Sequence, residues 1–108
     1  MEKCCLIMKW DYEYDKEGCW FDKDSGETRY ELTEGKSYSL PHMDKKKIEI
    51  RSVTSDKDTV KAEVYVDSHT VTVCNDGEPA VAHASYSYTA AGDCVYQSLR
   101  LTFTIEKQ

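Results

Sequence analysis

The amino-acid sequence predicts an all-β fold, an antiparallel two-sheet β-sandwich of about eight or nine strands, with a small closed β-barrel as the alternative. Apolar and polar side chains alternate through the second half of the chain, most regularly from Val95 to Ile105. Successive side chains of a strand point to opposite faces, so this alternation indicates strands with one buried and one exposed face. The apolar segments are short, turn residues separate them at regular spacing, and no long segment has the helical period.

In the first half of the chain, turn residues divide the alternation into four expected strands. Asp15–Gly18 and Lys23–Gly26 are the first two turns, and each ends in a glycine, which tolerates the positive φ of tight turns. A glycine at position 35 ends the third strand, and Pro41 ends the fourth because proline cannot donate a ladder hydrogen bond. The strands expected from this division span residues 4–14, 19–22, 27–33 and 36–40.

The second half is expected to contain five strands after an irregular segment at residues 41–47. Alternation resumes at Ile48, but Val53 falls out of phase with Ile50, which is the trace that a β-bulge leaves in a sequence. Residues 75–77, Asn-Asp-Gly, form the strongest hairpin signal in the chain. The strands expected here span residues 48–54, 59–67, 70–75, 80–89 and 94–106.

The strand expected at residues 80–89 has two weakly apolar faces. Alanines and two tyrosines occupy one face, and we expect the alanines to be buried with Tyr86 and Tyr88 near the rim of the core. His83 lies on the other face beside two serines, so we interpret it as part of a solvent-exposed polar surface.

The length and charge of the chain restrict its class and its partners. Residues 1–108 are expected to form a single all-β domain, because a chain of 108 residues is too short for two cores. The formal net charge of −6 at pH 7 disfavours binding to nucleic-acid phosphates, and we interpret Lys45–Lys47 as a solvent-exposed lead-in to a strand. No apolar run approaches the ~20 residues of a membrane span or the ~7–15 of a signal-peptide core. We therefore expect no membrane partner and a cytoplasmic location.

The cysteines are expected to be reduced thiols. The chain has five cysteines, and an odd number of cysteines cannot all form disulfides within one chain. In a meander of the last three strands, Cys74 and Cys94 would lie at opposite ends of the sheet, too far apart to form a disulfide. No C-x-x-C motif is present and the histidines stand alone, so we expect no zinc site and no cofactor. The five cysteines are Cys4, Cys5, Cys19, Cys74 and Cys94.

Three short segments resemble catalytic or metal sites, and each is better interpreted as an ordinary strand or turn. Asp22–Glu27 has the alternating carboxylates of a calcium loop, but its glycine comes too early and no helices flank it. Asp11 and Glu13 are neighbours on one strand face, as in glycosidases, yet acids on exposed faces are common. Residues 67–69, Asp-Ser-His, have the residue types of a hydrolase triad, but contiguous turn residues cannot adopt its geometry. We therefore expect no enzymatic activity and no catalytic residues.

Aromatic residues are the remaining signal for a function. Trp10, Tyr12, Tyr14 and Trp20 gather at the first hairpin, and Tyr65 is expected on an exposed strand face between two acids. Packing in the core and at its rim explains these rings without a ligand, but exposed rings also form protein-binding hot spots or stack on sugars. We take Tyr14, Trp20 and Tyr65 as the candidate ligand- or partner-binding residues.

The leading functional hypothesis is a non-enzymatic protein-interaction or scaffolding module, which includes self-association through an edge strand. The alternative is a module that binds a carbohydrate or small ligand, through the aromatic first hairpin or a barrel cavity.

Overall fold

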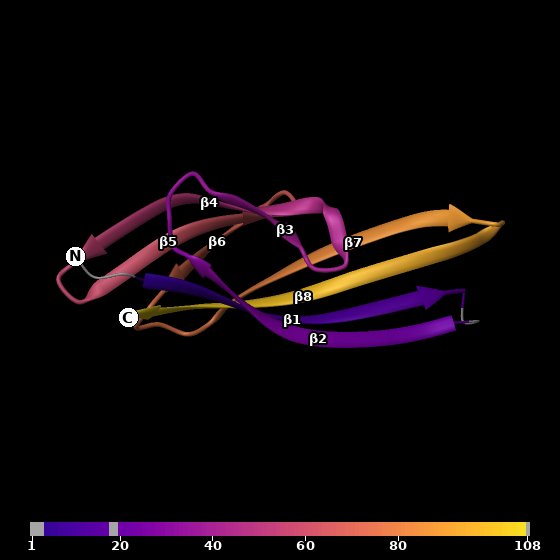
Figure 1. The fold of residues 1–108 in the computed structure, drawn as a ribbon, viewed down its shortest axis with the longest axis horizontal. Helices are drawn as coiled ribbons and strands as arrows, with labels where there is room; N and C mark the ends of the chain where they lie inside the picture. The colour runs from indigo at the N-terminus through magenta and orange to yellow at the C-terminus, as the bar shows by residue number, and fades with distance from the viewer. Residues whose placement is uncertain (1–3, 18–19, 108) are drawn as a thin grey trace.

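The computed structural model describes residues 4–17 and 20–107, and these residues form eight β-strands (Figure 1). None of the described residues belongs to a helix of the length and apolarity needed to cross a bilayer. The strands are β1 (Cys4–Lys16), β2 (Trp20–Glu31), β3 (Ser37–Leu40), β4 (Met43–Asp56), β5 (Thr59–Val66), β6 (His69–Cys74), β7 (Ala80–Ala90) and β8 (Asp93–Lys107).

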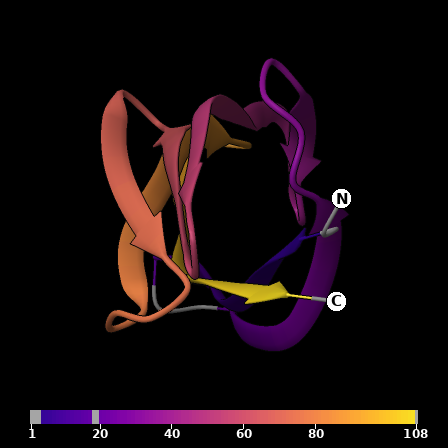
Figure 2. The same ribbon diagram turned by 90° about the vertical axis from the view of Figure 1, so that its left-hand side faces the viewer.

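The strands form two antiparallel four-stranded sheets, which confirms the predicted β-sandwich. One sheet has the strand order β2-β1-β8-β7 and the other has the order β3-β4-β5-β6. The two sheets are not joined into one closed barrel, so the alternative fold is wrong. In the view along the long axis of the molecule, the strands of the two sheets are arranged around a common interior (Figure 2).

Alternate residues of both sheets meet in one apolar core, as the sequence pattern predicts. Val64 of β5 and Phe103 of β8 are both completely buried, and so is Ile48 of β4. The predicted bulge is also present, because the pairing of β4 with β5 shifts register between Ile50 and Ser52. The buried alternating residues of β5 and β8 are Val60, Ala62, Val64, Val66, Val95, Leu99, Leu101, Phe103 and Ile105.

The two sheets differ greatly in length, and this difference shapes the molecule. The strands of the first sheet have 11 to 15 residues, whereas β3, β5 and β6 have only 4, 8 and 6. The molecule measures 55 × 21 × 17 Å, and one end of the first sheet projects beyond the second sheet (Figure 1). We call the projecting part the arm (residues 11–16, 20–25, 85–90 and 93–98) and the two-layered remainder the body.

Two predicted features of the first half are wrong. The expected turn at Lys23–Gly26 lies inside β2, which pairs with β1 from Trp20 to Glu31 without interruption. β1 offers a partner at every position, and this long-range pairing outweighs the local turn preference. The expected irregular segment at residues 41–47 is mostly strand, because β4 begins at Met43 after a tight turn at Pro41 and His42.

The predicted hairpin at residues 75–77 is also wrong. These residues connect β6 to β7, but β6 lies in the second sheet and β7 in the first, so the segment crosses between the layers. The expected meander of the last three strands therefore reduces to the hairpin of β7 and β8. The cysteines in the described part of the chain are free thiols, namely Cys4, Cys5, Cys74 and Cys94, whereas Cys19 lies outside the described residues.

Gly26 is required where the Trp10 ring crosses β2. Trp10 and Gly26 are directly opposite each other in the pairing of β1 with β2. A Cβ atom on Gly26 would lie 2.5 Å from Cζ2 of the indole, so the ring covers the space that a side chain would need. This packing helps to explain why glycine occurs in the middle of a strand, where it is ordinarily unfavourable.

Substitution of Gly26 by alanine is therefore expected to destabilise the protein by about 1–3 kcal/mol, the usual cost of overpacking. Urea unfolding monitored by circular dichroism measures the change in the free energy of unfolding. Gly77→Ala is the control, because its Cβ would meet Cys74 Cβ at an ordinary 3.6 Å. Equal stabilities of the two variants would contradict the proposed role of Gly26.

Candidate functional site

The inner side of the arm, which continues the core-facing side of the first sheet, is lined by tyrosines. Tyr12 and Tyr14 of β1 are in phase with the buried Met8, and Tyr86 and Tyr88 of β7 are in phase with buried alanines. No strand of the second sheet reaches over the end of the arm (Figure 1). We call Tyr12, Tyr14, Tyr86 and Tyr88 the tyrosine face.

The tyrosine face changes from buried to exposed along the arm. Tyr12, next to the body, is only 7% exposed, whereas Tyr86 and Tyr88 are 39% and 37% exposed. Ala82 and Ala84 are buried, which confirms the prediction that the alanines lie in the core and the two tyrosines at its rim. The rings of Tyr86 and Tyr88 lie 5.4 Å apart between centroids, so they present one continuous aromatic surface.

A pocket of about 380 Å³ lies where the tyrosine face meets the turn between β3 and β4. Aromatic rings form one wall, and the turn with the start of β4 forms the other. The pocket combines apolar surface with amino groups at its rim, a lining that suits an amphipathic side chain. Its lining residues are His42, Met43, Lys45, Lys46, Tyr86, Tyr88 and Gln97.

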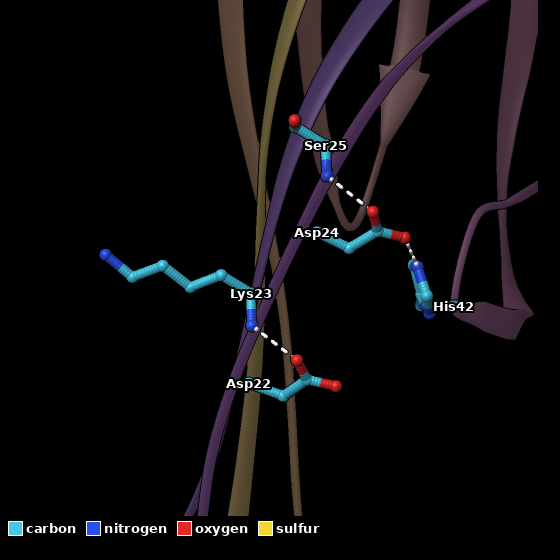
Figure 3. A network of polar contacts seen from close by, with 5 residues as sticks. All are labelled: Asp22, Lys23, Asp24, Ser25 and His42. Atoms are coloured by element: carbon cyan, nitrogen blue, oxygen red, sulfur yellow. Dashed lines mark hydrogen bonds and ion pairs between the residues drawn. The ribbon is translucent and has the colours of Figure 1, made fainter.

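His42 fastens this turn to the arm. Its Nε2 donates a hydrogen bond to Oδ2 of Asp24 at 2.7 Å (Figure 3). The imidazole also stacks on the Tyr12 ring, with centroids 4.1 Å apart and planes 11° apart, and it meets Trp10 edge-on at 5.4 Å. His42 has a φ of 62°, a left-handed conformation that is uncommon for residues other than glycine. The surrounding contacts therefore hold a strained turn in place at the junction of arm and body.

The carboxylates of β2 are fixed by local hydrogen bonds. Oδ1 of Asp24 accepts from the Ser25 amide, and Oδ1 of Asp22 accepts from the Lys23 amide, both at 2.9 Å (Figure 3). The hydrogen bond from His42 is the main cause that lowers the pKa of Asp24 below its ordinary value. These side chains place negative charge along the β2 border of the tyrosine face.

Burial raises the pKa of the Tyr12 hydroxyl above its ordinary value, and the neighbouring Tyr14, Tyr88 and Asp22 raise it further. These electrostatic neighbours come from three different strands, which shows that β1, β2 and β7 converge on the same inner surface. The Tyr12 hydroxyl is therefore neutral at physiological pH. Each tyrosine of the face offers an apolar ring and a hydroxyl that can donate and accept hydrogen bonds.

Two lysines of β4 border the pocket on the side away from β2. Lys45 is exposed, while Lys46 forms an ion pair with Asp67 in the turn between β5 and β6. The hydrogen bond from Lys46 is the main cause that lowers the pKa of Asp67. The second carboxylate oxygen of Asp67 accepts from the Ser85 amide of β7 at 3.2 Å. Asp67 thus connects the two sheets. It lies in a turn, as the sequence predicts for residues 67–69, although His69 already begins β6.

The outer side of the arm carries a second, more polar hollow of about 870 Å³. The register places Arg100 between Asp11 and His83, and it places Ser98 between Glu13 and Ser85. His83 is exposed beside Ser85 and Ser87, as predicted. No group of three or more potential metal-binding side chains occurs within the described residues.

Of the three residues chosen from the sequence, Tyr14 and Tyr65 lie in different sheets. Tyr14 belongs to the tyrosine face, where it is half-buried. Tyr65 lies in the second sheet, half-buried under Arg51, whose Cζ is 3.8 Å from the ring centroid. Trp20 begins β2, but its side chain lies outside the described residues. The structure therefore does not bring Tyr14 and Tyr65 into one site.

Comparison of the chain with protein-family models, with curated proteins and with solved structures gave no match.

Sequence reasoning did not identify His42 or the joint contribution of β1 and β7 to one surface. The in-phase positions of Tyr86 and Tyr88 after the buried alanines are a signal that places them on the inner side of the sheet. Their proximity to Tyr12 and Tyr14 depends on β8 lying between β1 and β7. For His42, nothing in the local sequence indicates its partner, because Asp24 is 18 residues away.

The pH dependence of the Asp24–His42 contact has a defined direction. Because the pKa of Asp24 is lowered in the folded state, the contact stabilises the fold fully above the ordinary value of 3.8 and is lost as the pH falls through the lowered value. In a ¹³C NMR titration, the Asp24 carboxyl is expected to have its midpoint below 3.8, and His42→Ala should move that midpoint upward. The Asp67 carboxyl serves as the control, since its pKa is lowered chiefly by Lys46 and should not respond to His42→Ala. An unchanged Asp24 midpoint would refute the assignment.

Proposed function

We propose that this chain is a non-enzymatic protein-interaction module that binds its partners through the arm. The observation that supports this proposal is the tyrosine face, an aromatic surface in phase with the core, on which Tyr86 and Tyr88 remain 39% and 37% exposed. In the body, the same side of the first sheet is covered by β3 to β6. A partner placed against the arm would complete the second layer that this chain does not supply.

The chemistry of the tyrosine face favours a protein partner. Tyrosine is enriched in binding hot spots because its ring buries a large apolar area while its hydroxyl still finds a hydrogen-bond partner. Carboxylates of β2 border the face on one side, and Lys45 borders the pocket on the other. Such a border of opposite charges fixes the orientation of a bound segment more than it adds affinity.

Selection of binders from a display library of random peptides tests this function. The wild-type chain is expected to enrich peptides that bind the arm, and the double variant Tyr86→Ser/Tyr88→Ser should weaken their binding by at least about tenfold, as expected for hot-spot tyrosines. Tyr96→Ser is the matched control, because Tyr96 is 51% exposed on the outer side of the same arm. Peptides that bind both variants and the wild type equally well, or no enrichment at all, would argue against the proposal.

The outer hollow favours carbohydrate binding as a second candidate function. The exposed rings of Phe21 (58%) and Tyr96 (51%) lie on the outer side of the arm. Phe21 of β2 and Tyr96 of β8 are the two cross-strand neighbours of Asp15 on β1, so one ring lies on each side of Asp15. Beyond these rings, the hollow offers carboxylates, serine hydroxyls and Arg100, which match the hydroxyl groups of sugars.

A glycan array followed by NMR titration tests this candidate. Binding through the outer hollow predicts that Tyr96→Ser abolishes the signal, while Tyr86→Ser/Tyr88→Ser on the inner side leaves it intact. Absence of binding across the array would exclude this function for the glycans that the array contains.

A further inference from the structure

The four edge strands of the two sheets differ in how they are protected against pairing with other chains. An unprotected edge presents a row of free backbone groups, and native proteins ordinarily block such rows with charges, short strands or coverage. β3 is protected by its length of only 4 residues. β6 lies beside the body half of β7, where the two sheets approach each other. β2 is protected by its charged residues, which are Asp22, Lys23, Asp24, Glu27, Arg29 and Glu31.

Beyond the contact of Ser85 with Asp67, the arm half of β7 has none of these protections. The segment Ser85–Ala90 contains no charged residue and extends past the short strands of the second sheet. β8 is the strand that pairs with β7, and the order of the described strands places no other on its opposite side. Beyond Ser85, the arm half of β7 is therefore an open and uncharged sheet edge.

The hydrogen bond between Ser85 and Asp67 shows which backbone amides of the arm half of β7 point away from β8. The Ser85 amide points away from β8 and donates to the Asp67 carboxylate. Backbone groups alternate in direction along a strand, so the amides of Ser87 and Thr89 point the same way as that of Ser85. Asp67 occupies the first of these amides, and the two beyond it are available to a further strand.

We propose that a second copy of this chain occupies this edge, with the arm halves of the two β7 strands paired antiparallel about a twofold axis at Ser87. This pairing rests on the proposed function of the arm as a protein-binding surface, and it identifies the partner as a second copy of the chain. In this register Ser87 faces its equivalent, and Thr89 faces Ser85 of the second copy. The Ser85 amide then exchanges the Asp67 carboxylate for the Thr89 carbonyl of the second copy. The two four-stranded sheets become one sheet of eight strands.

The side chains of this edge are complementary to themselves. Tyr86 and Tyr88 lie two residues apart on the inner side, so the twofold axis places Tyr86 opposite Tyr88 of the second copy. Cross-strand aromatic pairs of this kind stabilise antiparallel sheets. The tyrosine faces of the two copies thereby join into one continuous surface, and the serines and threonine of the outer side pair with one another.

Charge also favours a second copy at β7 over one at the other long edge. Each chain carries a net charge of −6, so contact between two copies is favourable only where few charges meet. β7 from Ala80 to Ala90 has no acidic or basic residue except His83, whereas β2 would bring carboxylates together. Because pairing is antiparallel and confined to the arms, the bodies lie at opposite ends and do not collide.

Sedimentation equilibrium of the full chain at concentrations from about 5 to 500 µM, a range that covers weak specific dimers, tests the pairing. The wild type is expected to dimerise. Ser87→Pro should raise the dimer dissociation constant at least about tenfold, because it removes an outward-pointing amide without breaking the β7–β8 ladder. Ser87→Lys should have the same effect, since it places two like charges directly opposite each other at the axis.

Thr72→Lys on β6 is the matched control, because Thr72 is an exposed residue of an edge strand opposite Glu63. It should dimerise as the wild type does. Hydrogen exchange supplies a local readout, and the outward-pointing amides of Ser87 and Thr89 should exchange more slowly at high protein concentration. A folded Ser87→Lys variant that dimerises like the wild type would overturn the proposed pairing.

The two proposals fail in different ways. A wild-type chain that stays monomeric at every concentration, yet enriches peptides that depend on Tyr86 and Tyr88, would overturn self-pairing and support the protein-interaction function. A dimer that is weakened by Ser87→Lys, with no peptide bound by the tyrosine face, would support the pairing and limit the interaction function to self-association. A dimer that responds to Thr72→Lys and not to Ser87→Lys would overturn the β7 interface.

Discussion

The antiparallel pairing of β1 with β8 is the interaction on which the rest of the structure depends. It runs without a register shift from the Cys4–Lys107 pair to the Lys16–Val95 pair and so joins the first and last strands of the chain. β2 and β7 are each hairpin neighbours of one of these strands, and they extend the sheet on either side. The length of this central pair sets the length of the whole first sheet.

The second sheet is too short to cover the first, and this mismatch creates the arm. Where both layers are present, residues such as Leu101 and Val64 are completely buried. Farther along the first sheet, on β1 and β7, apolar aliphatic side chains give way to Tyr14, Tyr86 and Tyr88, whose rings tolerate a partly wet surface. The change in residue type along one face thus follows the change from two layers to one, and it leaves a surface suited to an additional layer from another chain.

Contacts at the boundary of arm and body fix the position of one sheet relative to the other. On one side, His42 bonds to Asp24 and stacks on Tyr12. On the other side, Asp67 receives hydrogen bonds from both Lys46 and Ser85. The His42–Asp24 and Asp67–Ser85 contacts each link a turn of the second sheet to an edge strand of the first. Local turn conformations with positive φ, at His42 and Asp67, are stabilised by these long-range partners.

The alternation of side chains by itself determined the fold class, the buried faces of β5 and β8, and the bulge in β4, because these depend on the two-residue period of a strand. The burial of Ala82 and Ala84 beside exposed tyrosines followed from the same period. Tertiary structure alone decided that β2 runs through Lys23–Gly26, because a continuous partner strand outweighs local turn preference. It also decided that the Asn-Asp-Gly turn crosses between sheets and that β1 and β7 share one tyrosine face, because strand order depends on pairing between residues far apart in the chain.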